Sequence, residues 1–349
     1  MRKAKYTIGV DLHKTVLQFC VLDSLGNVVE EKRRSTVTLK QGMEVVHDLE
    51  KWKKAGRLVV EAVGVNRWFV KACLDKGLHV VIADPVKLGL RMLGKKTDRR
   101  DAYELARRLW MGDIDRNAKT YFPTDDEYGH RKVLRVRHKL VSIRQQLVNQ
   151  IRGMINAYKV PYPSGCLYTP RRLSQLRECA FPTETMEEAF QVLIDGLEAI
   201  QASIEQLSRK IERSATQDER ASSLMEMLPS VGSQTAITLV NELGDLSRFS
   251  SSKKVAAYVG LVPRVSDSAD KHHHGRVTKR GNKELRWILS EWAVRLMAKH
   301  PQVKAWAAPR LKRMHKNKVR VTLARRLLIG VYVFFTRGEV FSLERCLAR

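Results

Sequence analysis

The segment Tyr6-Thr7-Ile8-Gly9-Val10-Asp11 is a short run of strand-forming residues that stops at a carboxylate. A second run, Leu17–Leu22, follows it. The residues after that run, 23–27, include the Asp, Gly and Asn that are typical of a tight turn. A third strand pattern then begins at Val28. We therefore predict three consecutive strands joined by hairpins.

The next sixty residues alternate between helix and strand patterns. The two strands are apolar runs, as expected of buried strands, and the first of them ends at Glu61. The predicted order is helix 41–53, strand 58–60, helix 66–75 and strand 79–83. Three hairpin strands followed by strands that alternate with helices is the order of a mixed sheet of the RNase H type. We predict such an α/β domain over residues 1–120.

The pattern changes at Tyr121–Asp126, where a proline and two acids mark a boundary. Apolar residues then recur at spacings of three and four over Val133–Met154 and again over Phe190–Ile211. This periodicity predicts a coiled-coil pair of long helices within residues 121–215. Residues 216–349 are predicted to form a mostly helical, basic C-terminal domain.

Composition narrows the class of protein. The 64 Lys and Arg residues against 37 Asp and Glu give a formal charge of +27, which points to a nucleic-acid partner. The hydrophobic content of 44% favours a folded body over a disordered basic tail. The five cysteines are scattered singly, which argues against a thiolate metal site and fits a reducing cytosol. The longest apolar run, Leu327–Phe335, is too short to span a membrane and predicts a buried helix.

Four acids form a candidate metal site. Asp11 and Glu61 end two strands that would be neighbours in the sheet, and the carboxyl ends of such strands meet in one crevice. Asp98 and Asp101 lie one turn apart in a helical pattern within a basic block. A cap or ion-pair role explains each acid singly, but four together need cations, and carboxylates suit Mg²⁺. We predict two Mg²⁺ ions that would act on a phosphodiester.

Basic and turn-forming segments are candidates for nucleic-acid contact. Residues 227–236 read as a turn entering a helix whose first amides could hold a phosphate, although an ordinary helix start has the same pattern. The segment 304–326 has many Lys and Arg and no acid. His272–His274 are adjacent and rarely share one ligand face, so we favour a polar loop there over a metal site. The predicted nucleic-acid-binding residues are Lys95, Lys96, Arg99, Arg100, Ser230, Gly232, Arg264, Arg276, Lys279, Arg280, Arg310, Lys312, Arg313, Lys316, Lys318 and Arg320.

Three strings in the first half resemble the DEDD transposases of bacterial insertion sequences. They are Ile8-Gly9-Val10-Asp11, Glu61-Ala62-Val63-Gly64 and Lys96-Thr97-Asp98-Arg99-Arg100-Asp101-Ala102. The resemblance implies a RuvC-like N-terminal domain, with Asp11, Glu61, Asp98 and Asp101 as its four catalytic, metal-binding acids. The family often has Thr where this chain has Val63, a difference that removes no ligand.

The second half resembles the same family's transposase domain, in which a serine shortly after a Gly-Leu-x-Pro motif is the nucleophile. Alignment on Gly260-Leu261-Val262-Pro263 assigns that role to Ser268, with Ser266 as the weaker alternative. The family usually has Gly after the serine, where this chain has Ala269. The resemblance implies an RNA-guided recombinase that forms a phosphoserine intermediate. Its partners would be donor DNA, target DNA, a structured bridge RNA and further copies of itself, as a dimer to tetramer.

Two other classes of function stay open on the sequence. A junction resolvase or structure-selective nuclease would use the four acids and water, without a covalent adduct. A non-catalytic nucleic-acid-binding protein would need the acids only for structure. In each case we expect a cytoplasmic bacterial protein associated with the nucleoid, without a membrane partner.

Overall fold

The computed structural model describes residues 4–88, 97–162, 164–268, 271–277 and 281–348, and for 263–268 and 271–277 it describes the backbone alone. The chain divides into two compact units, residues 1–122 and 123–349, and each is described by itself.

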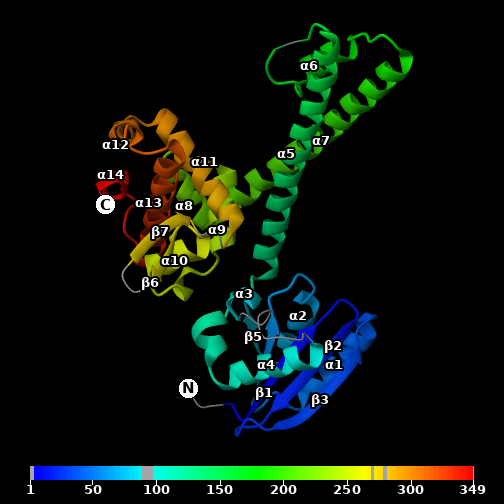
Figure 1. Cartoon of the computed structure of the whole chain (residues 1–349), viewed down its shortest axis with the longest axis vertical. Coiled ribbons are helices and arrows are strands. Elements are labelled where there is room, and N and C mark those ends of the chain that lie inside the picture. Colours follow the sequence, from blue (N-terminus) through cyan, green and yellow to red (C-terminus); the bar gives the residue numbers. More distant parts are fainter. Residues whose placement is uncertain (1–3, 89–96, 163, 269–270, 278–280, 349) are drawn as a thin grey trace. The chain divides into compact units, whose positions relative to one another are not determined.

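The first unit is built on a five-stranded mixed sheet with the order β3-β2-β1-β4-β5 (Figure 1). β1, β2 and β3 are antiparallel neighbours, whereas β4 pairs parallel with β1 and β5 pairs parallel with β4. The strands are β1 (Tyr6–Leu12), β2 (Val16–Leu22), β3 (Val28–Ser35), β4 (Gly56–Glu61) and β5 (His79–Ala83). This arrangement confirms the predicted RNase H-like fold.

Helices cover both faces of the sheet because successive side chains in a strand point to opposite sides. Val10 and Val60 pack with α1 (Leu39–Glu50) and α2 (Arg67–Asp75) on one face. Val59 and Val81 pack on the other face with α4 (Asp98–Trp110). The short α3 (Pro85–Leu88) and the π-helix η2 (Ile114–Ala118) contribute to this second layer.

The first helix begins two residues earlier than its apolar pattern predicted. Thr38 and Gln41 form a capping box, in which the Thr38 hydroxyl accepts from the Gln41 amide and the Gln41 side chain accepts from the Thr38 amide. This reciprocal pair satisfies two amide donors at the helix start and therefore sets its boundary.

The second unit contains two long helices, α5 (Asp125–Tyr158) and α7 (Glu184–Gln217), joined through α6 (Pro170–Arg177) (Figure 1). They run antiparallel, since Arg137 on α5 bonds to Ser208 and Arg144 bonds to Gln201. The C-terminal half of α5 and the N-terminal half of α7 enclose a small separate core, which includes Val148, Ile151, Ile155, Phe190, Ile194 and Leu197. The predicted helical pair is confirmed.

The remaining helices of this unit surround a larger core. At its centre the fully buried Trp292 donates from Nε1 to the carbonyl of Pro229, at 2.8 Å. The elements are α8 (Glu219–Met227), α9 (Ser233–Leu243), the 3-10 turn η3 (Leu246–Arg248), α10 (Ser252–Val259), the hairpin of β6 (Pro263–Ser268) and β7 (Lys271–Val277), α11 (Lys283–Lys299), α12 (Pro301–Leu311), α13 (Lys316–Arg337) and α14 (Leu343–Ala348).

The longest apolar run of the sequence lies in α13, where Leu327, Leu328 and Val331 are fully buried. The predicted buried helix is therefore confirmed. Among the described residues, every helix falls short of the length or the apolarity that crossing a bilayer would need.

Candidate functional site

Asp11 and Glu61 lie side by side at one edge of the first unit's sheet. Val10 pairs with Val60 in the parallel β1–β4 ladder, so the residues that follow them are neighbours. Since Val59 packs on the α4 side of the sheet, Glu61, two residues on, belongs to the same face. Asp11 stands two residues after Gly9, which also faces α4, and it is only 8% exposed.

Asp98 and Asp101 occupy the first turn of α4. The Thr97 hydroxyl accepts from the Arg100 amide and caps the helix, so neither carboxylate is needed as the cap. The helix N-terminus carries a partial positive charge, which favours two acids at this position. These two acids reach the sheet because α4 packs very closely on β1.

His13, which is not among the ligands predicted from the sequence, joins this group. Its Nε2 lies 3.1 Å from Asp11 Oδ2 and 3.3 Å from Asp98 Oδ1. One ligand atom from each of these three residues lies within 4.8 Å of the others. The sequence could have predicted this contact. His13 follows Asp11 by two residues, and side chains two apart along an extended chain point to the same face of a sheet.

The groups around Asp11 at this edge of the sheet shift its pKa in opposite directions. Burial raises the pKa of Asp11 above its ordinary value, His13 lowers it, and the nearby charges of Asp101 and Asp98 raise it again. Arg33 Nη2 also approaches Asp98 Oδ2, at 3.7 Å. A partly buried group of carboxylate oxygens with one imidazole suits a hard divalent cation, which would relieve the repulsion among the acids.

The four predicted acids therefore differ in the contacts that place them at this site. Asp11 and Asp98 share ligand distance with His13. Asp101 is close enough to Asp11 to act on its pKa. Glu61 is placed by its strand, where its backbone carbonyl accepts from Asn66 Nδ2 at 2.6 Å.

The predicted serine belongs to the second unit. Ser268 is the last residue of β6 and pairs with Lys271 in the hairpin, while Ser266 pairs with His273. Their side chains lie outside the described part of the structure, as do those of Arg264, Arg276 and His272–His274. Lys95, Lys96, Ala269, Lys279 and Arg280 lie wholly outside the described residues.

The remaining predicted nucleic-acid contacts fall into three groups, at the start of α4, before α9 and in the basic C-terminal segment. Arg99 is held by Glu31, with its Nη2 2.7 Å from Oε2, and Arg100 is exposed beside it. Ser230, with a positive φ of 59°, and Gly232 are exposed before α9. Neither observation identifies a ligand.

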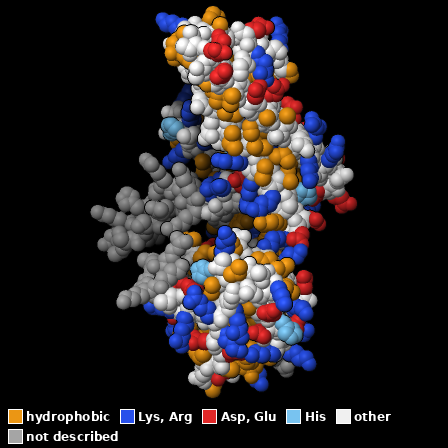
Figure 2. Space-filling model, turned by 90° about the vertical axis from the view of Figure 1, so that its right-hand side faces the viewer, with side chains coloured by type: hydrophobic (Ala, Val, Ile, Leu, Met, Phe, Trp, Pro, Cys, Tyr) orange, Lys and Arg blue, Asp and Glu red, His pale blue; other side chains and the backbone are white. Residues whose placement is uncertain are grey.

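The basic C-terminal segment is only partly a surface. Lys312, Arg313, Lys316 and Lys318 are exposed, and Arg320 is half-buried. Trp306, which lies among these cations in the sequence, is 9% exposed, and Arg310 stacks on its ring at 4.2 Å. The tryptophan thus belongs to the core because α12 turns its apolar side inward. Figure 2 shows Lys and Arg side chains interspersed with Asp and Glu over the face in view.

Two family models match the chain. Residues 8–160 match the DEDD type of insertion-sequence transposases, a model described as Transposase. Residues 222–308 match a model described as Transposase IS116/IS110/IS902 family.

Similar curated proteins span almost the whole chain. The transposase for insertion sequence element IS1111A of Coxiella burnetii is 27% identical, over 96% of this chain and 90% of its own length. The transposase for insertion sequence element IS1328 of Yersinia enterocolitica is 25% identical, over 96% and 98%. Among solved structures, Thermus thermophilus RuvC aligns with 33% of this chain and 99% of its own, at 13% identity and a TM-score of 0.25.

Proposed function

Since the chain belongs to the DEDD transposases of insertion sequences and is an enzyme of DNA recombination, we propose that it cuts and rejoins DNA through a serine-linked intermediate with help from Mg²⁺. The observation that carries the catalytic half of the proposal is the convergence of Asp11, Asp98 and His13 at the sheet edge next to Glu61. A solvated ion-pair cluster would not require a buried carboxylate whose pKa is raised.

The four acids would hold two Mg²⁺ ions. When bound there, the ions would polarise a phosphodiester and stabilise the charge that develops on its oxygens. Asp11 would bind from the sheet and Asp98 and Asp101 from α4, so the two elements together set the separation of the ligands. Glu61 would close the site from β4.

Ser268 would carry the covalent step. Its Oγ attacks the phosphorus of a DNA phosphodiester, an O–P bond forms, the bond to the deoxyribose oxygen breaks, and the hydroxyl proton passes to that leaving oxygen. A deoxyribose hydroxyl of another strand then attacks the phosphoserine and takes the phosphate, and the serine regains a proton. The support is the match of residues 222–308 to the transposase model.

The other parts would serve assembly. We assign residues 1–120 to a catalytic domain, 121–215 to the helical pair that joins subunits, and 216–349 to the serine-bearing domain. The basic surface would bind donor DNA, target DNA and a structured guide RNA in a complex of two to four copies. Base pairing would then select the target and the protein would contact mainly backbones, in the nucleoid.

The test is to trap a protein–DNA adduct on insertion-junction DNA with Mg²⁺. Wild type and S266A should form it, and S268A and D11N should not. Ser266 is the matched control, because it lies on the same strand two residues away. An adduct that persists in S268A would overturn the serine role, and strand cleavage by S268A without an adduct would favour a nuclease.

A further inference from the structure

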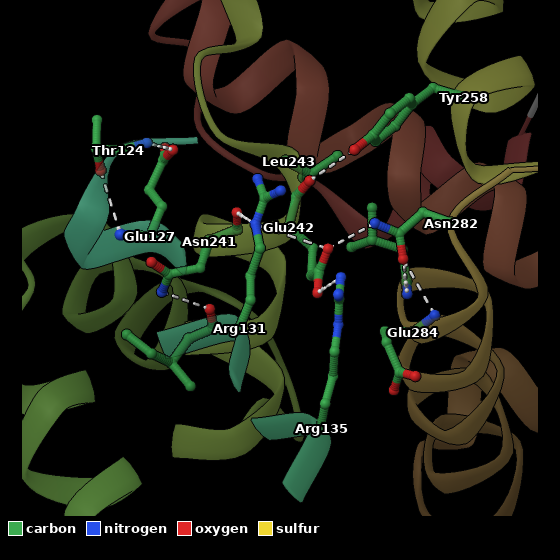
Figure 3. Close-up of polar contacts among 12 residues, drawn as sticks. Thr124, Glu127, Arg131, Arg135, Asn241, Glu242, Leu243, Tyr258, Asn282 and Glu284 are labelled. Atoms are coloured by element: carbon green, nitrogen blue, oxygen red, sulfur yellow. Dashed lines mark hydrogen bonds and ion pairs between the residues drawn. The ribbon is translucent and has the colours of Figure 1, made fainter. Parts of the chain in front are cut away.

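Glu242 on α9 is a buried carboxylate of the second unit. It is 1% exposed, and burial of a charge is costly unless the charge is paired. Arg135 Nη2 lies 2.8 Å from its Oε1, and Arg131 Nε lies 3.8 Å from its Oε2. Asn282 Nδ2 donates to Oε2 at 2.7 Å (Figure 3). Two cations from α5 and one amide from the start of α11 therefore meet on a single carboxylate.

The same residue also contacts the segment that enters the β6–β7 hairpin. The hydroxyl of Tyr258, near the end of α10, donates to the backbone carbonyl of Glu242 at 3.2 Å (Figure 3). Tyr258 comes five residues before β6, and Asn282 comes five residues after β7. Glu242 thus bonds to the chain on both sides of the hairpin.

The two ends of the hairpin are also held to each other. The Asn282 amide donates to the carbonyl of Tyr258 at 3.0 Å, and Arg286 Nη1 donates to the carbonyl of Val259 at 2.8 Å. Gly281 has a φ of +118°, and a Cβ there would overlap the Tyr258 carbonyl oxygen. This close approach requires glycine. The hairpin therefore leaves and rejoins the helical body at one point, beside Glu242.

Asn282 has two roles at this point. Its Oδ1 accepts from the amides of Glu284 and Leu285 and caps α11, while its Nδ2 is the donor to Glu242. An Asp at this position would keep the cap but would set a second carboxylate against Glu242. The capping and positioning contributions of Asn282 can therefore be separated by substitution.

We propose that Glu242 is the positioning residue of the β6–β7 hairpin and that it holds the end of β6, with Ser268, at a set place relative to α5. A two-stranded hairpin alone is only marginally stable in water, so its place depends on how its ends are anchored. The link to α5 is direct, because Arg131 Nε also donates to the carbonyl of Asn241, at 2.8 Å. The part of this inference that concerns catalysis rests on the proposed role of Ser268.

The test uses N282D, E242Q and the double variant E242Q/N282D in the full-length chain. N282D places two carboxylates together, and E242Q removes the charge that Arg131 and Arg135 share. The double variant restores one carboxylate and one amide in exchanged positions, so a hydrogen bond of reversed direction can form. We measure the rate of adduct formation at saturating DNA, the affinity for DNA, and hydrogen exchange of the backbone amides of β6 and β7.

We expect N282D to slow adduct formation by about tenfold or more and to speed exchange in the hairpin, with DNA affinity changed less than about twofold. The double variant should recover to within about threefold of wild type in both readouts. E284Q is the matched control, since the Glu284 carboxylate joins α11 to His138 of α5 at 2.9 Å and so serves a different contact between the same two helices. It should leave exchange in the hairpin unchanged.

Three results would overturn the inference. They are single variants that match wild type, a double variant no better than the worse single variant, and an E284Q variant that loosens the hairpin as much as N282D does. If wild type forms no adduct, or S268A still forms one, the serine role fails instead. Hydrogen exchange then still decides whether Glu242 anchors the hairpin.

Discussion

Gly9 of β1 lies directly against the backbone of Ala102 in α4. A Cβ at position 9 would overlap the carbonyl oxygen of Ala102 and the backbone nitrogen of Ala106. The small side chains of Ala102 and Ala106 are themselves fully buried at this contact. The absence of a side chain on Gly9 therefore lets α4 approach the sheet closely enough for Asp98 to come within reach of His13 and Asp11.

G9A should displace α4 from β1 and separate the acids. Because the overlap is with backbone atoms, which cannot rotate away, we expect a loss of stability of about 2–4 kcal/mol. Binding of Mg²⁺ should weaken together with the stability, as measured by calorimetry and chemical denaturation. G64A is the control, since a Cβ on Gly64 would meet no atom within 4 Å. Equal stability of G9A and wild type would contradict the close-packing argument.

D11N should stabilise the metal-free protein while it abolishes the metal site. Burial and the charges of Asp101 and Asp98 raise the pKa of Asp11, so the ionised form is disfavoured in the folded state. A neutral amide should therefore raise the melting temperature in EDTA by a few degrees. In wild type, Mg²⁺ at ten times its Kd should add about 1.4 kcal/mol, and D11N should show no such gain.

The variant H13A tests whether D11N stabilises the protein because it relieves repulsion among the acids, or only because it removes a charged group. The imidazole of His13 lies 3.1 Å from Asp11 and 3.3 Å from Asp98, and its interaction with Asp11 lowers the pKa of that carboxyl. Its removal should destabilise the protein in EDTA, in the direction opposite to D11N. A stabilising effect of H13A would mean that the acids do not repel one another at this edge.

Removal of exposed cations from the start of α13 should weaken DNA binding in a salt-dependent way. K316A/K318A takes away two exposed charges. Each lost phosphate contact should reduce the slope of log K against log salt by about 1, so we expect a change of about 2. Fluorescence anisotropy between low and moderate salt measures this slope. R345A, whose cation is already paired with Glu339 at 3.3 Å, should change it less.

The Arg57–Asp115 pair should stabilise the first unit in a defined range of pH. The two side chains form paired contacts of 2.7 and 2.8 Å, and the hydrogen bonds from Arg57 lower the pKa of Asp115 below 3.8. A depressed pKa means that the contribution is fully present above 3.8 and is lost as the pH falls from there through the folded-state value.

D115N should therefore cost about 1 kcal/mol at neutral pH and almost nothing once the pH is below the folded-state pKa. Urea denaturation at several pH values measures the difference from wild type. D48N is the comparison, because Asp48 contacts Arg34 at 3.4 Å with both side chains about 40% exposed. A constant cost for D115N at all pH values would exclude ionisation of Asp115 as the cause.

Local patterns were sufficient to predict the strand order and the long helices. The buried face of each element leaves a local pattern in the sequence. The pattern is an alternation along β1 and β4 and a period of three to four residues along α5 and α7. The start of α1 lies two residues before the predicted one because a capping box, not the apolar pattern, sets where its helical hydrogen bonds begin. The burial of Trp306 depends on which face of α12 packs inward, and its basic neighbours in the sequence do not reveal that face.

The sequence by itself determined the RNase H-like sheet and the adjacency of Asp11 and Glu61, because parallel neighbours bring their carboxyl ends together whatever else the chain does. Only the tertiary structure decided that His13 joins Asp11 and Asp98. It alone placed Arg131, Arg135 and Asn282 around Glu242. Those contacts depend on how closely separate helices and strands pack, and packing is set by the shapes of residues far apart in the chain.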